Sequence, residues 1–144
     1  MATKINFITE EIDFNLKNKI KIRNWLSQII ATHNFKLVEL NFIFCSDDYL
    51  LKINIEYLNH NTLTDIITFD NSEEDKIIEG DIFISIDRVK ENAQTFGVTF
   101  ENELHRVLSH GTLHLLGFKD KNPSDKKEMT AKEDQSLALL STLI

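Results

Sequence analysis

The segment Val107–Asp120, with the sequence VLSHGTLHLLGFKD, restricts the fold of this 144-residue chain most strongly. Its apolar character predicts a largely buried helix, and that helix carries His110 and His114. A helix turns about 100° per residue, so two rings four positions apart leave the same face, separated by about 6 Å along the axis. Gly117 is predicted to end the helix, and the chain reversal there brings Asp120 back towards the histidines.

This spacing predicts a zincin-type site for one zinc ion, with His110, His114 and Asp120 as ligands and catalytic residues. Three protein ligands leave a fourth position open, as in catalytic zinc sites. A histidine pair on a helix is often coincidence, but burying two imidazoles without partners costs free energy. Gly111, inside the same helix, costs about 1 kcal/mol against alanine, which predicts the close approach of another element or a ligand.

Gly111 also argues against the most familiar enzymes that have such a histidine pair. Zinc peptidases with an HExxH motif use a glutamate after the first histidine as general base, and that position is Gly111 here. Glu103, further back on the helix, is an acid expected to approach the same face. A zinc peptidase-like hydrolase therefore stays open as a disfavoured alternative.

The rest of the chain predicts a single α+β domain spanning residues 1–144, with helices packed on a four-stranded mixed sheet in the order βαβαββααα. The penultimate helix carries the zincin-like metal site. The expected strands are Lys4–Ile8, Leu37–Cys45, Asp65–Phe69 and Gly80–Ser85. The expected helices are Leu16–Ala31, Asp47–Tyr57, Ile86–Phe96, Thr99–Leu116 and a last helix from Pro123. The acidic segment Asn71–Lys76 suits a hairpin between the last two strands.

Apolar periodicity predicts which side chains form the core. The predicted core residues are Ile20, Trp25, Leu26, Ile29 and Ile30 on the first helix, Val38, Leu40, Phe42 and Phe44 on the second strand, and Met129, Leu137 and Leu140 on the last helix. We expect Cys45 to be a core residue, and His33 and His105 to be ordinary surface or packing residues.

Charge and cysteine content limit the function classes. The formal net charge of −7 excludes a generic nucleic-acid binder, because such binding depends on lysine and arginine. A lysine cluster after His114 predicts either a local basic rim or a solvated helix face; its members are Lys119, Lys121, Lys126, Lys127 and Lys132. One cysteine permits no internal disulfide, and neither a signal peptide nor a membrane span is found, so a cytoplasmic location is expected.

Three stretches of this sequence resemble the YbeY family of bacterial rRNA maturation factors. The first is HGTLHLLGF at residues 110–118, preceded by Glu103-Leu104 and Arg106. The second is Leu58-Asn59 followed by TDIITF at residues 64–69, and the third is Gly80-Asp81-Ile82 with Ile84-Ser85. The predicted element order fits as well, so the resemblance covers nearly the whole chain.

The resemblance implies a metal-dependent, single-strand-specific endoribonuclease acting in 16S rRNA maturation and ribosome quality control. It implies one Zn²⁺ per chain and, as partners, single-stranded or ribosomal RNA and the small ribosomal subunit, with no membrane or DNA partner. The acidic charge also suits a basic ribosomal protein. A ribosome-assembly factor whose zinc is mainly structural is the second alternative.

This chain departs from the family pattern at two positions. The third ligand of the family is usually histidine, whereas the equivalent residue here is Asp120, and the loop after Asn59 lacks the usual arginine. Candidate substrate-binding residues are Lys119, Lys121, Arg88 and His60. His60 is interpreted either as an acid or base or as an exposed loop histidine. Phe69 and Phe118 are candidates for base stacking or core packing, and Asp65 and Asp81 for shaping the cleft or bonding backbone groups.

Overall fold

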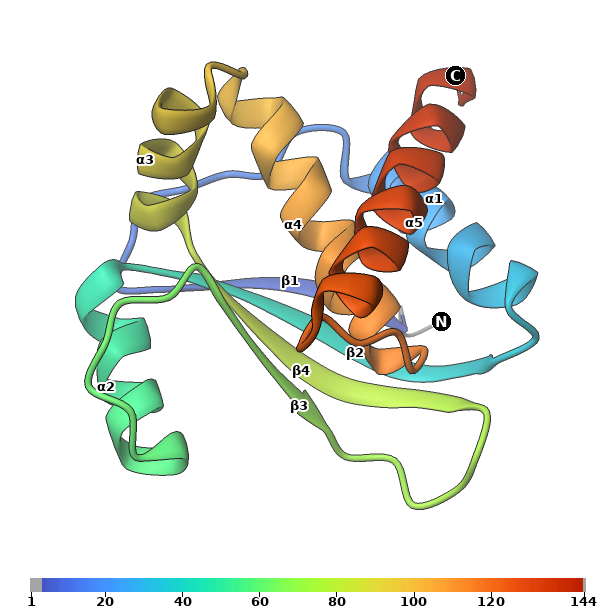
Figure 1. The fold of residues 1–144 in the computed structure, drawn as a ribbon, viewed down its shortest axis with the longest axis horizontal. Coiled ribbons are helices and arrows are strands. Elements are labelled where there is room, and N and C mark those ends of the chain that lie inside the picture. The colour runs from blue at the N-terminus through green and yellow to red at the C-terminus, as the bar shows by residue number, and fades with distance from the viewer. Residues whose placement is uncertain (1–3, 144) are drawn as a thin grey trace.

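Four strands form one mixed sheet in the order β1-β2-β4-β3 (Figure 1). The computed structural model describes residues 4–143. Its strands are β1 (Ile5–Glu10), β2 (Lys36–Cys45), β3 (Ile66–Asp70) and β4 (Ile77–Ser85). Its helices are α1 (Lys19–Thr32), α2 (Asp47–Leu58), α3 (Ile86–Phe96), α4 (Phe100–Leu115) and α5 (Pro123–Thr142). The predicted α+β fold and element order are therefore confirmed.

Strand pairing explains why the sheet is mixed. β2 pairs in parallel with β1 on one side and with β4 on the other, whereas β3 and β4 form the antiparallel hairpin that the acidic segment predicted. The prediction that Val38 faces the core is wrong, because this side chain is 38% exposed. The register of β2 against β4 shifts between Leu37 and Glu39, so one extra residue interrupts the alternation of faces.

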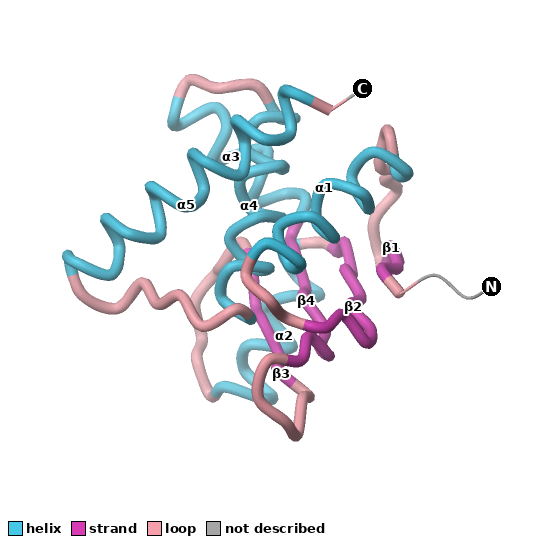
Figure 2. Tube along the Cα trace, turned by 90° about the vertical axis from the view of Figure 1, so that its right-hand side faces the viewer, coloured by secondary structure: helices cyan, strands magenta, loops and turns pink. Residues whose placement is uncertain are grey.

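The helices divide unequally between the two faces of the sheet. α1, α3, α4 and α5 lie on one side of the strands, as Figures 1 and 2 show. The main hydrophobic core fills the space between these helices and the sheet. α2 covers part of the other face over a smaller cluster formed around Cys45, Leu50 and Ile67. Cys45 is fully buried as predicted, and burial raises the pKa of its thiol to about 12.

α1 is anchored in the core through one face. Trp25 is fully buried, and its indole N–H donates a 2.7 Å hydrogen bond to the carbonyl of Ser136 on α5. Ile20 was predicted on this face, but it is 75% exposed and Ile22 is buried instead. Two residues correspond to about 200° of helical rotation, so Ile20 and Ile22 face opposite sides. In the described part of the chain, no helix has the length and apolarity needed to cross a membrane.

Candidate metal centre

One face of α4 forms a wall of the cavity that holds the predicted site. The helix begins after Thr99, whose hydroxyl accepts a hydrogen bond from the Asn102 N–H as an N-cap. The α4 residues that line the cavity are Glu103, Arg106, Val107, His110 and His114. These positions recur every three or four residues and therefore share one helix face. The cavity has a volume of about 550 Å³, which is within the range of ligand pockets.

Gly111 lies about a quarter turn around α4 from the cavity-lining face, where the helix packs against the sheet. A Cβ atom at this position would lie 2.9 Å from the Cδ1 atoms of both Ile66 and Ile82. The predicted close approach of another element is confirmed, and that element is the β3–β4 hairpin. A glutamate here would direct its side chain into these isoleucines, so position 111 is unsuited to the general base of an HExxH peptidase.

Asp120 returns to the helix as predicted. Gly117 follows α4 with a φ of +104°, a backbone conformation that favours glycine. The chain then turns back, and Asp120 Oδ2 lies 3.3 Å from His110 Nε2. The His110 and His114 ring centroids are 6.3 Å apart, and all three predicted ligands line the same cavity.

A carboxylate from α5 holds the other nitrogen of His110. Glu133 Oε2 lies 2.7 Å from His110 Nδ1, while Glu133 Oε1 accepts a 2.9 Å hydrogen bond from Arg106. Arg106 also donates to Asp134 at 2.8 Å. Glu133 is therefore fixed between an arginine and a histidine. A carboxylate at Nδ1 sets the ring tautomer and directs the Nε2 lone pair towards a metal ion.

The environment of His110 favours a positive charge. Burial opposes protonation of the ring, but the hydrogen bond and charge of Glu133, with the charges of Asp120 and Asp65, outweigh it and raise the pKa of His110. Positive charge is thus stabilised at the point where Nε2 and Asp120 meet. A metal cation would supply that charge in place of the ring proton.

The chemistry of the donor set fits zinc. Two imidazoles and one carboxylate are ordinary zinc ligands, and the Glu133 contact supplies the outer partner that such histidines usually have. Within residues 4–143, no three histidine, cysteine or acidic side chains are already clustered closely enough to hold an ion. Zinc coordination would therefore bring His114, which is exposed on the last turn of α4, and the His110–Asp120 pair closer together.

The opposite wall of the cavity comes from the end of α2, the segment that follows it and the start of β3. Its lining residues are Leu58, His60, Thr62, Leu63, Thr64, Asp65, Ile66, Ile67 and Thr68. Asn54 on α2 anchors this segment, because its Nδ2 donates a 2.9 Å hydrogen bond to the Thr62 carbonyl. His60 is exposed and lines the cavity, which is compatible with either role predicted for it.

Two further carboxyl groups line the cavity. Burial raises the pKa of Asp65, although the charge of His110 acts in the opposite direction. Burial also raises the pKa of Glu103, and the charge of Asp65 adds to this effect. Asp81 is not among the lining residues and accepts hydrogen bonds from Asn41 and Asn71. Of the two aspartates predicted to shape the cleft, the structure therefore places Asp65 there.

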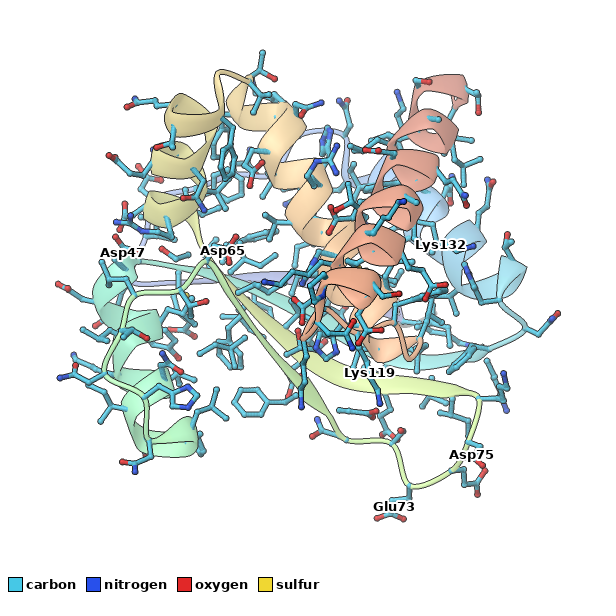
Figure 3. All side chains as sticks on the ribbon, viewed as in Figure 1. Asp47, Asp65, Glu73, Asp75, Lys119 and Lys132 are labelled. Carbon is cyan, nitrogen blue, oxygen red and sulfur yellow. The ribbon has the colours of Figure 1, made fainter. Side chains whose placement is uncertain are left out.

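The predicted cations lie outside the cavity lining. Lys119 and Lys121 are exposed on either side of Asp120, and Figure 3 shows Lys119 below the first turn of α5. Arg88 on α3 forms a 2.9 Å ion pair with Asp47. The prediction that these residues bind substrate is not tested by their positions. Phe69 contacts Tyr57 and Phe83, and Phe118 packs against the core, so both rings have packing roles.

Glu133 is the site residue that the sequence analysis missed. It lies four residues after Met129 and seven before Leu140, on the face of α5 that is buried against the rest of the protein. An acidic residue within an apolar stripe is a recognisable signal, because buried carboxylates require a partner. The identity of the partner, His110, depends on how α5 packs on α4.

Comparisons with known proteins agree with this architecture. A model of the family described as Endoribonuclease YbeY matches residues 4–141. A Cytophaga hutchinsonii protein named Endoribonuclease YbeY is 55% identical over 135 residues, covering 94% of each chain. A Flavobacterium johnsoniae protein of the same name is 50% identical, covering 94% of this chain and 96% of its own. The solution structure of TM1509 from Thermotoga maritima matches with a TM-score of 0.66 and 28% identity, covering 94% of this chain and 88% of that one.

Proposed function

The chain belongs to the endoribonuclease YbeY family, and from this premise we propose that it is a zinc-dependent, single-strand-specific endoribonuclease acting in 16S rRNA maturation and ribosome quality control. The family name supports the reaction class. Residues 1–144 would form one catalytic domain, and the lone cysteine supports a cytoplasmic location.

The environment of His110 is the observation that carries the proposal. This ring has Asp120 at Nε2 and Glu133 at Nδ1, at 3.3 and 2.7 Å. His110, His114 and Asp120 would hold the zinc ion. When bound, zinc would supply Lewis acidity towards a phosphate oxygen or towards a water molecule. Glu133 and Arg106 would keep the His110 ring in its orientation while substrate enters and leaves.

The position of the lysines supports RNA as the substrate. Lys119 and Lys121 flank Asp120 in the sequence and are exposed, so they would attract phosphates to the edge of the cavity. A base would enter the cavity only when it is unstacked, which single-stranded RNA permits. His60, which lines the opposite wall, would contact the same strand.

Negative charge on the hairpin between β3 and β4 supports a role on the ribosome. Glu73, Glu74 and Asp75 are exposed on the hairpin between β3 and β4, and Figure 3 shows Glu73 and Asp75 at its tip, away from Lys119. An acidic hairpin suits a basic ribosomal protein on the small subunit. The acidic charge of the protein, −7 overall, equally suits the alternative of an assembly factor whose zinc is mainly structural.

The test is to measure zinc content and RNA cleavage on the same preparations of wild type, His114→Ala and Asp120→Ala. We expect about one zinc per wild-type chain and its loss in both variants. Cleavage of single-stranded RNA should fall about a thousandfold, because bound metal stabilises transition-state charge by several kcal/mol. A zinc-free wild type that cleaves RNA would contradict the metal dependence. Variants that lose zinc and cleavage yet still support ribosome maturation would favour the assembly factor.

A further inference from the structure

The cavity has a second end that zinc binding would not use. Glu103 precedes His110 by seven residues on the same face of α4, about two turns or 10 Å along the axis. Its side chain lines the cavity, and the residue is only 5% exposed. Asp65 lines the same cavity, and Figure 3 shows it where the segment after α2 enters β3.

The Glu103 carboxyl group has acceptors available for a ligand. Among the hydrogen bonds and ion pairs formed by residues 4–143, none involves its oxygens. The described residues also include no buried side-chain oxygen that lacks a hydrogen-bond partner. The Glu103 oxygens must therefore reach the open space of the cavity. A side chain that is 95% buried and open only towards a cavity is positioned to accept hydrogen bonds from whatever enters it.

Charge and shape limit what can enter this end. Burial raises the pKa of Glu103, and the charges of Asp65 and Glu133 add to this effect. Because these acidic groups line the same cavity, their negative charge would repel a phosphate there. Arg106 is already bound to Glu133 and Asp134. Apolar side chains from both sides, including Leu58, Ile66 and Val107, line the same cavity. A flat, neutral group that carries hydrogen-bond donors fits these walls, and an unstacked nucleobase is such a group.

We propose that this inner end of the cavity binds the Watson–Crick edge of an unpaired guanine, with Glu103 as the acceptor and Asp65 as a second acceptor beside it. This inference rests on the proposed function, because it assigns the base of the RNA whose phosphate lies near His110 and Asp120. It makes Glu103 a specificity residue for substrate selection and gives it no part in bond cleavage.

The donor pattern of the bases selects guanine. Its N1–H and N2 amine lie side by side, and a carboxylate accepts two parallel hydrogen bonds. Uracil offers a single N–H between two carbonyl oxygens, which the carboxylates repel. Cytosine and adenine each place an amine beside a bare ring nitrogen, which leaves one favourable bond and one repulsive contact. We therefore expect guanine to bind most tightly and uracil most weakly.

The experiment measures equilibrium binding of short oligouridines that carry one central guanosine, inosine or uridine, using fluorescence anisotropy. We expect wild type to bind the guanosine strand about tenfold more tightly than oligouridine, which corresponds to one good bidentate contact. Inosine lacks the N2 amine and should lie between the two. The Glu103→Gln variant presents one acceptor and one amine, so it should lose the preference and keep its affinity for oligouridine.

Glu101→Gln is the matched control, because Glu101 lies on the same helix, is exposed, and forms a 3.9 Å ion pair with Lys17. This variant should retain the guanosine preference. Equal wild-type affinities for guanosine and uridine strands, or an unchanged preference in Glu103→Gln, would overturn the guanine site alone. Failure to bind or cleave any single-stranded RNA would overturn the proposed function with it. The comparison of guanosine, inosine and uridine strands uses wild type only, so it still tests the guanine site if Glu103→Gln folds poorly.

Discussion

The two walls of the cavity differ in how firmly their side chains are held. On the α4–α5 wall, His110 contacts both Asp120 and Glu133, and Glu133 also binds Arg106. On the opposite wall, residues 58–63 are exposed, and Asn54 holds them through the Thr62 carbonyl. The first wall is a set of charged groups that fix each other, whereas the second is a surface segment attached at few points.

This difference matches the tasks proposed for the two walls. Metal ligands must keep their geometry within narrow limits, so they benefit from helices and from partners that fix each ring. A flexible strand of RNA is better met by a segment that can adjust, as binding loops often do. Changes on the first wall should therefore alter zinc binding, and changes on the second should alter RNA binding while zinc stays bound.

The largest expected effect comes from Gly111→Val, a change behind the first wall where α4 packs on the sheet. The new side chain would meet Ile66 and Ile82 where a Cβ alone already lies at 2.9 Å, and overpacking should lower the free energy of unfolding by about 3 kcal/mol. Gly111→Ala is the matched control, because its single methyl group meets Ile66 and Ile82 at 2.9 to 3.1 Å without the two further methyl groups of valine, and a gain of about 1 kcal/mol in helix propensity offsets part of that crowding. Urea denaturation measures both. A valine variant as stable as wild type would show that α4 is not held closely against the hairpin.

Glu133→Gln should weaken zinc binding by about tenfold or more, as loss of an outer carboxylate partner usually does. The amide oxygen can accept from either His110 or Arg106, whereas the carboxylate serves both at 2.7 and 2.9 Å. Competition with a chromophoric chelator gives the dissociation constant. Glu128→Gln changes an exposed residue of the same helix and should leave zinc affinity unaltered. Equal zinc affinities in the two variants would show that Glu133 does not support zinc binding.

Asn54→Ala tests the second wall. Loss of the hydrogen bond to the Thr62 carbonyl should lower the free energy of unfolding by about 1.5 kcal/mol and weaken RNA binding, while zinc content stays at the wild-type level. The exposed Asn24 on α1 provides the control substitution Asn24→Ala. Thermal unfolding, RNA anisotropy and metal analysis on one preparation separate these effects. Loss of zinc in Asn54→Ala would show that the two walls are not independent.

Asp47→Asn should have the smallest effect and lower the free energy of unfolding by about 1 kcal/mol at neutral pH. Asp47 begins α2, which carries the second wall, and it binds Arg88 on α3 at 2.9 Å. Burial opposes the charge of Asp47, but hydrogen bonds from Arg88 and Ser85 outweigh it and lower the pKa below its ordinary value of 3.8.

The sign of the pH dependence follows from that lowered pKa. The unfolded chain takes up the proton first as pH falls, so the stabilisation from Asp47 is complete well above pH 3.8 and is lost as pH falls through the folded-state pKa. The stability difference between wild type and Asp47→Asn should shrink in that acid range. Asp48→Asn, at the exposed next position, should show no such trend. A difference that grows on acidification would contradict the proposed role of the ion pair.

The sequence by itself determined the elements of this protein and the residues most suited to bind metal. Helical spacing placed His110 and His114 on one face, and the need for a positive φ at Gly117 predicted the turn that returns Asp120. These features depend on neighbours within about ten residues, so local periodicity and backbone sterics are sufficient to predict them.

Only the tertiary structure decided which distant groups complete the site. Glu133 reaches His110 because α5 packs on α4, and Asp65 meets the same cavity because β3 lies beside that helix. The exposure of Val38 depends on a register shift between two strands. These outcomes follow from contacts between segments 20 to 45 residues apart, and no local pattern specifies which of the many acidic residues such packing will bring to a given histidine.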